Sequence, residues 1–142
     1  KDILADNISS IVKMVNRFLR SFVGFILEVI IDEGRFEMFV MKNDIKLGIG
    51  DLSGYETFIL NVAFKYALLK LSMINKCGCL FIDEGLDCID VGNFERLGEV
   101  FSGLKKVFGK IIVITHIEDI RRFEKWNIQI SRGTGGNSLI KK

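Results

Sequence analysis

The sequence predicts an α/β domain: a parallel sheet flanked by helices, with a small antiparallel β segment near the N-terminus. Two short apolar runs, Cys79–Ile82 and Ile111–Thr115, are typical of strands in a parallel sheet. Helical patterns before, between and after these runs imply right-handed crossover connections. With 142 residues, 49% of them hydrophobic, the chain is long enough for one domain with a substantial core. We therefore expect a single unit over residues 1–142.

Residues 1–22 have the periodicity of an amphipathic helix. Their apolar residues recur at spacings of four and three, namely Leu4, Ile8, Ile11, Val15, Phe18 and Phe22. About three heptads are too few to define a coiled coil, so packing against a sheet is the commoner explanation and the end of a coiled coil is the alternative.

Residues 25–49 are predicted to form the antiparallel segment. The runs Phe25–Ile31 and Phe36–Met41 are rich in β-forming residues and are separated by the turn signal Asp32-Glu33-Gly34-Arg35. A third run, Ile45–Ile49, follows. Together they predict a β-rich lobe ahead of the α/β part.

Residues 50–142 contain the α/β part. Ser53 and Glu56 form a capping box that predicts the start of a helix running to roughly Asn75. The strand Cys79–Ile82 is expected to be buried on both faces. The later elements are predicted at Val91–Val107 (helix), Ile111–Thr115 (strand), Ile117–Trp126 (short basic helix), Ile128–Ile130 (a further strand of the parallel sheet), Gly133–Ser138 (turn) and Leu139-Ile140.

Acidic and imidazole side chains stand at the ends of both apolar strands. Asp83 and Glu84 follow the first strand and His116 follows the second, so a parallel pairing brings them to one edge of the sheet. Asp83 suits Mg²⁺ with retained waters, Glu84 suits a general base acting on water, and His116 suits donation to a phosphoryl group. The plainer alternatives are a solvated loop start for the two acids and a capping or packing role for the histidine.

Four motifs in a fixed order carry a more specific resemblance. Leu52–Glu56 resembles the signature motif of ATP-binding-cassette ATPases, and Leu80–Glu84 resembles their Walker B strand. Ile89-Asp90 resembles their D-loop, and Ile112–His116 resembles their switch-histidine strand. The N-terminal helix and the form of the turn after Glu84 are most similar to the C-terminal half of the head in SMC and SbcC-type coiled-coil ATPases.

The resemblance implies a fold, cofactors and site residues. The fold is the C-terminal lobe of a P-loop ABC-type ATPase head, and the cofactors are ATP and Mg²⁺. The implied roles are metal binding for Asp83, polarisation of the hydrolytic water for Glu84, γ-phosphate sensing for His116, and nucleotide binding at the opposite head for Ser53, Gly54, Glu56 and Asp90. Tyr55 stands where the family usually has Gly, and its bulk could crowd the approach of the backbone to phosphate.

The Walker A loop of these ATPases, Gly-x-x-x-x-Gly-Lys-Ser/Thr, does not occur in the sequence. In SMC and SbcC-type proteins that loop lies in the N-terminal half of a split head. The implied partners are therefore the N-terminal Walker A lobe of the same polypeptide, a second head in a homodimer, DNA and a nuclease subunit. We expect the isolated chain to lack ATPase activity. A start at Lys1 within a helical pattern also indicates a piece of a longer polypeptide.

Composition bears on the partners, the state of the cysteines and the cellular location that we expect for the protein. A formal net charge of +2 neither demands nor excludes a nucleic-acid partner, and the basic groups around Arg121 and Lys105 are equally explained as solvated faces. The three cysteines are an odd number and indicate reduced, intracellular thiols, while a zinc site through Cys77 and Cys79 lacks further ligands. Neither a long apolar span nor a signal peptide is evident, so we expect a soluble protein of the cytoplasm, nucleoid or nucleus.

Two other functions fit part of the pattern. A metal-dependent nuclease or phosphoesterase would use Asp83, Glu84, Asp87 and His116 as ligands, and would leave Leu52–Glu56 as a simple helix cap. A non-catalytic scaffold that dimerises through its first helix would bind no nucleotide. Cleavage of DNA without ATP would identify the former.

Overall fold

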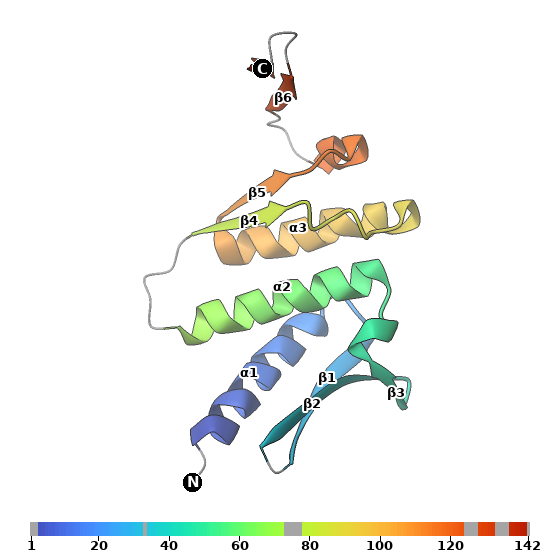
Figure 1. The fold of residues 1–142 in the computed structure, drawn as a ribbon, viewed down its shortest axis with the longest axis vertical. Coiled ribbons are helices and arrows are strands. Elements are labelled where there is room, and N and C mark those ends of the chain that lie inside the picture. The colour runs from blue at the N-terminus through green and yellow to red at the C-terminus, as the bar shows by residue number, and fades with distance from the viewer. Residues whose placement is uncertain (1–2, 33, 73–77, 124–127, 133–136, 142) are drawn as a thin grey trace.

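The computed structural model describes residues 3–32, 34–72, 78–123, 128–132 and 137–141. It confirms the α/β class, with a small antiparallel sheet first and a parallel strand pair flanked by helices after it (Figure 1). The helices and strands are α1 (Ile3–Leu19), β1 (Phe25–Asp32), β2 (Arg35–Lys42), β3 (Ile45–Gly48), α2 (Gly54–Leu71), β4 (Cys79–Asp83), α3 (Phe94–Phe108), β5 (Lys110–Ile114), β6 (Gln129–Arg132) and β7 (Ser138–Lys141).

The first helix packs against both β1 and α2, so its apolar stripe is covered by other elements of the same chain. Val15, Phe18 and Leu19 are buried on this stripe. Asn16 fixes the contact, because its amide nitrogen donates to the Leu27 carbonyl at 2.8 Å and its amide oxygen accepts from the Leu27 N–H at 2.7 Å. Both backbone hydrogen-bonding groups of Leu27 in β1 are thereby satisfied by a helix side chain.

The antiparallel segment has the predicted three strands in the order β1-β2-β3. Asp32 pairs with Arg35, which leaves a two-residue hairpin loop. Gly34 in that loop has φ +79°, a conformation that glycine adopts without a Cβ penalty. The turn signal in the sequence was therefore interpreted correctly.

The helix α2 begins at the predicted cap and ends earlier than predicted. Ser53 is the N-cap, whereas the C-cap is Ser72, whose backbone is extended and whose N–H donates to the Leu68 carbonyl. The predicted continuation to Asn75 falls on residues 73–77, which lie outside the described residues, as does Cys77. Figure 1 shows α2 lying between α1 and α3, and its side chains at seven positions are buried.

The strands β4 and β5 pair in parallel, but only one face of this pair is covered. Leu80 and Ile82 of β4 are buried, and α3 packs along β5. On the other face Phe81 is 58% exposed, Ile112 43% and Ile114 52%. The prediction that this strand is buried on both faces is therefore wrong, because nothing among the described residues covers the second face.

The C-terminal segment differs from the sequence prediction. β6 pairs with β7 as an antiparallel hairpin, so the expected addition of residues 128–130 to the parallel sheet is wrong. The expected basic helix after His116 is a 3-10 helix over Glu118–Phe123, and its predicted end at Trp126 lies outside the described residues. No helix in the described part of the chain is both apolar and long enough to cross a membrane.

Candidate functional site

The parallel register of β4 and β5 brings the acid pair and the histidine to one edge of the sheet. Asp83 pairs with Ile114, and the Glu84 N–H donates to the Ile114 carbonyl at 2.9 Å. His116 follows two residues later, and its Nδ1 lies 3.9 Å from Oδ1 of Asp87. The predicted convergence at the carboxyl ends of the two strands is confirmed.

The two acids of the pair differ in backbone geometry. Asp83 continues the alternation of β4 and lies on the same open face as Phe81 and Ile114. Glu84 has φ +47°, in the left-handed region that costs a non-glycine residue about 1–2 kcal/mol. The strand ends at Asp83, and both acidic residues are exposed.

In the turn after Glu84, residues 85–90, two apolar side chains are buried and the remaining residues are exposed. Leu86 is fully buried and Ile89 is 5% exposed, whereas Asp87, Cys88 and Asp90 are exposed. The Asp90 carbonyl accepts from the Asn93 N–H at 2.8 Å, which leads the chain into α3. The apolar anchors therefore fix the turn while its polar side chains face outward.

Ser53, Glu56 and Lys42 form a hydrogen-bonded network at the start of α2. The Ser53 hydroxyl donates to Oε2 of Glu56 at 2.8 Å, and the Ser53 N–H donates to the same oxygen at 3.0 Å. Lys42 Nζ lies 2.8 Å from Oε1 of Glu56. Partial burial acts to raise the pKa of Glu56, but the hydrogen bonds from Lys42 and Ser53 outweigh it and hold that pKa below its ordinary value. The predicted capping box is confirmed.

The start of α2 also contacts the acidic turn. A Cβ placed on Gly54 would lie 1.6 Å from the Cys88 carbonyl oxygen, so the two backbones are in close contact. Tyr55 is only 3% exposed, and the Arg96 guanidinium lies 4.6 Å from the centre of its ring. No local sequence pattern indicates the Gly54–Cys88 contact or the Tyr55–Arg96 contact. Arg96 is not among the site residues predicted from the sequence.

The acids and the histidine do not form a multidentate metal cluster. Across the described residues, no group of three or more His, Cys, Asp or Glu side chains is placed to hold a metal ion. A site for Mg²⁺ needs less, because this ion usually keeps several waters and binds one or two carboxylates. The exposed carboxylate of Asp83 at the strand end suits that mode of binding, whereas a four-ligand nuclease centre finds no support.

No protein-family model matches the chain, but individual proteins are similar to it in sequence. The chain is 24% identical to the SbcC component of the SbcCD nuclease of Deinococcus radiodurans over 122 residues, which are 78% of this chain and 13% of the relative. It is 27% identical to the double-strand break repair Rad50 ATPase of Thermococcus kodakarensis over 104 residues, which are 73% of this chain and 12% of the relative.

Solved structures show the same fold. An SMC ATPase structure matches 99% of this chain and 87% of its own length with a TM-score of 0.74 at 19% identity. The SMC head domain of Thermotoga maritima matches 99% of this chain and 49% of its own length with a TM-score of 0.62. This chain is related to SbcC and Rad50 and has the fold of an SMC head. It spans only 13% and 12% of the length of the two curated relatives named above.

In this SMC-type fold, the side chain of Tyr55, which stands where the signature motif of ABC ATPases usually has Gly, lies in the interior of the lobe. Tyr55 is buried beside Arg96 and Ser53 is exposed, so the two side chains point to different environments. Burial raises the pKa of the Tyr55 hydroxyl, with Arg96 acting in the opposite direction. The Tyr55 ring is therefore packed inside the lobe, and the effect of its bulk on the approach of the backbone to phosphate stays a prediction.

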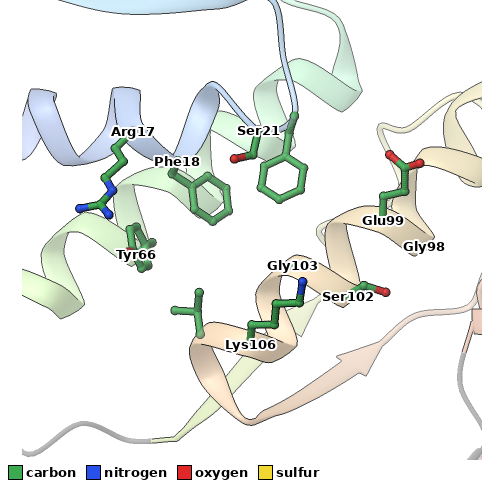
Figure 2. Close-up of a pocket in the computed structure, with 11 residues that line it drawn as sticks. Arg17, Phe18, Ser21, Tyr66, Gly98, Glu99, Ser102, Gly103 and Lys106 are labelled. Carbon is green, nitrogen blue, oxygen red and sulfur yellow. The ribbon is translucent and has the colours of Figure 1, made fainter.

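The same SMC-type lobe contains a separate groove between α1, α2 and α3 (Figure 2). Its volume is about 620 Å³, and none of the site residues predicted from sequence lines it. Figure 2 shows Arg17 and Tyr66 on one side of the groove and Ser102 and Lys106 on the other. The groove is thus distinct from the acidic edge of the sheet.

Proposed function

We propose that this chain is the C-terminal lobe of an ATP-binding and ATP-hydrolysing head in an SMC/SbcC-like DNA repair or chromosome-organisation protein. The head would act by ATP-dependent dimerisation. The observation that carries this proposal is the parallel register of β4 and β5, which joins Asp83-Glu84 and His116 at one edge in a chain related to SbcC and Rad50.

At that edge the chain supplies three groups to the reaction. Asp83 binds Mg²⁺, which supplies charge neutralisation for the phosphates when bound. Glu84 accepts a hydrogen bond from the hydrolytic water and orients it. His116 contacts the γ-phosphate, and its neighbour Asp87 lies 3.9 Å from its ring nitrogen.

A second surface of the lobe acts on the ATP held by the opposite head. The N-terminus of α2 is the positive end of an 18-residue helix, which favours an anion. Ser53 and Gly54 lie at this end and contact the γ-phosphate, while Glu56 holds the serine in place and Asp90 contributes from the neighbouring turn. Nucleotide sandwiching therefore closes two heads, and hydrolysis reopens them.

The open face of β4 and β5 is the docking site for the N-terminal Walker A lobe of the same polypeptide. Phe81, Ile112 and Ile114 form an exposed apolar surface on the same side as Asp83. Since the relatives are many times longer than this chain, a further segment is available to cover that surface. Covering it buries the three side chains and brings the phosphate-binding loop to Asp83.

The proposed partners also include DNA and a nuclease subunit. The Rad50 relative is a double-strand break repair ATPase, and the SbcC relative is a subunit of a nuclease. One of the similar SMC structures comes from work on the DNA-stimulated activation of SMC ATPases. Nothing in the charge pattern of the lobe selects its own DNA-contacting residues, so this assignment follows from the relationship alone.

The test compares ATP hydrolysis by the chain alone, by the chain with the N-terminal lobe, and by the Glu84→Gln variant of that complex. We expect no hydrolysis by the chain alone, restored hydrolysis in the complex, and an ATP-bound closed dimer without turnover in the variant. Phe81→Ser should prevent complementation, while Ile45→Ser, 60% exposed on β3, serves as the matched control.

Two results would refute the proposal. Robust hydrolysis by the isolated chain would exclude a split head, and normal turnover by Glu84→Gln would remove Glu84 from its role. Metal-dependent cleavage of DNA without ATP would instead favour a nuclease.

A further inference from the structure

We propose that Cys88 and Arg96 hold Gly54 and Tyr55 of α2 in place by direct contact, an arrangement called the clasp below. The signature loop (residues 53–56) and the turn that contains the D-loop (residues 85–90) then move as one rigid unit. This clasp rests on the proposed function only for its consequence in the ATP cycle. Its physical basis is two contacts, in which Gly54 and Tyr55 of the first turn of α2 meet Cys88, which precedes α3, and Arg96 in the first turn of α3.

The first contact is between backbones and leaves no room for a side chain. A Cβ on Gly54 would lie 1.6 Å from the Cys88 carbonyl oxygen and 2.6 Å from its carbonyl carbon. Gly54 lies in the first turn of α2, so glycine is required there by the approach of Cys88. The Cys88 thiol also lies 3.6 Å from the Gly54 carbonyl oxygen, within the range of a weak S–H donor.

The second contact is between Tyr55, the residue after Gly54, and Arg96 of α3. The Arg96 guanidinium lies 4.6 Å from the centre of the buried Tyr55 ring, in a cation–π arrangement. The Arg96 Nη2 also donates to the Phe22 carbonyl at 3.3 Å, which fixes the orientation of the guanidinium. The tyrosine that departs from the usual motif thus has a positioning role, because it anchors the loop that presents Ser53.

The consequence concerns Ser53 and Asp90, which the proposed function assigns to the same opposite nucleotide. The buried side chains of Leu86 and Ile89 anchor the turn between β4 and Asp90 to the core, and Gly54 is in close contact with the Cys88 backbone in that turn. A displacement of one loop therefore displaces the other. Cys88, Tyr55 and Arg96 position the two residues that touch the nucleotide, without touching it themselves.

The first experiment measures amide hydrogen exchange in the chain alone, and so needs no nucleotide. Gly54→Ala should raise exchange in residues 53–56 and 85–90 together by about tenfold or more. Gly50→Ala and Gly92→Ala are matched controls, because a Cβ at either position meets nothing within 4 Å. If Gly54→Ala changes exchange no more than these controls, or changes one segment only, the clasp is refuted.

A second pair of variants covers the case in which Gly54→Ala does not fold. Arg96→Ala removes the cation from Tyr55 without any overlap, whereas Arg96→Lys keeps a cation over the ring. We expect faster exchange in both segments for Arg96→Ala and recovery of most of the protection in Arg96→Lys. Unchanged exchange in Arg96→Ala would overturn the proposal.

The final measurement uses the head complemented with its N-terminal lobe. Arg96→Ala should leave ATP binding by a single head unchanged and weaken ATP-dependent dimerisation by about tenfold, or about 1.4 kcal/mol. Gly54→Ala is not used in this measurement, because Gly54 itself is assigned a contact with the nucleotide. A merely structural defect would lower both. Unchanged dimerisation in a variant with loosened loops refutes the positioning role, whereas failure of the unsubstituted head to dimerise with ATP refutes the proposed function and leaves the exchange result standing.

Discussion

Replacing Ser53 by alanine separates the capping role of this serine from its proposed contact with phosphate. The substitution removes the acceptor for the Glu56 N–H, at 3.4 Å, and the hydroxyl that donates to Oε2 of Glu56 at 2.8 Å. An N-cap substitution by alanine costs about 0.5–2 kcal/mol. Because the N–H contact is at the long end of hydrogen-bond distances, we expect about 1 kcal/mol, which lowers Tm by about 3 °C in a domain of this size.

Glycine at the same position provides the decisive comparison. At an N-cap, glycine costs only a few tenths of a kcal/mol, although it lacks the hydroxyl as alanine does. Stability should therefore fall in the order Ser53, Ser53→Gly, Ser53→Ala. ATP-dependent dimerisation of the complemented head should instead be lost to a similar extent in both variants, since both lack the phosphate-contacting hydroxyl.

The assays are urea unfolding followed by circular dichroism for the chain, and light scattering with and without ATP for the complemented head. Ser10→Ala is the control, because the Ser10 hydroxyl is exposed and only donates to the Asp6 carbonyl within α1. Equal destabilisation by glycine and alanine would refute the capping argument. Dimerisation that follows stability would refute the separate phosphate contact.

Two further predictions concern the pH dependence and the core. Because the folded-state pKa of Glu56 is lowered, its stabilising contribution is present above its ordinary value of 4.5 and is lost as pH falls through the lower folded value. The Tm difference between the chain and Glu56→Gln should therefore be largest near pH 7 and vanish in acid; a constant difference would contradict this. Leu104 is fully buried in α3, so Leu104→Ala should cost about 2–5 kcal/mol in urea unfolding, while Val107→Ala, at a position 36% exposed, should cost far less. Similar losses for the two would refute the assigned core.

The sequence by itself determined the order and type of most elements, whereas the roles of its site motifs stay predictions. Local signals were sufficient here: the capping box at Ser53 and Glu56 started α2, and the turn around Gly34 set the first hairpin. The apolar runs of β4 and β5 also predicted their parallel pairing, and with it the common edge of Asp83 and His116.

Only the tertiary structure decided how these elements contact one another. Gly54 and Cys88 are 34 residues apart, and no local pattern encodes a backbone contact over that separation. The same holds for the burial of Tyr55 beside Arg96, which no local pattern indicates. Strand pairing of β6 with β7, and the open face around Phe81, likewise depend on which surfaces the rest of the chain covers. Residue type sets what a segment can form, but burial depends on its neighbours in space.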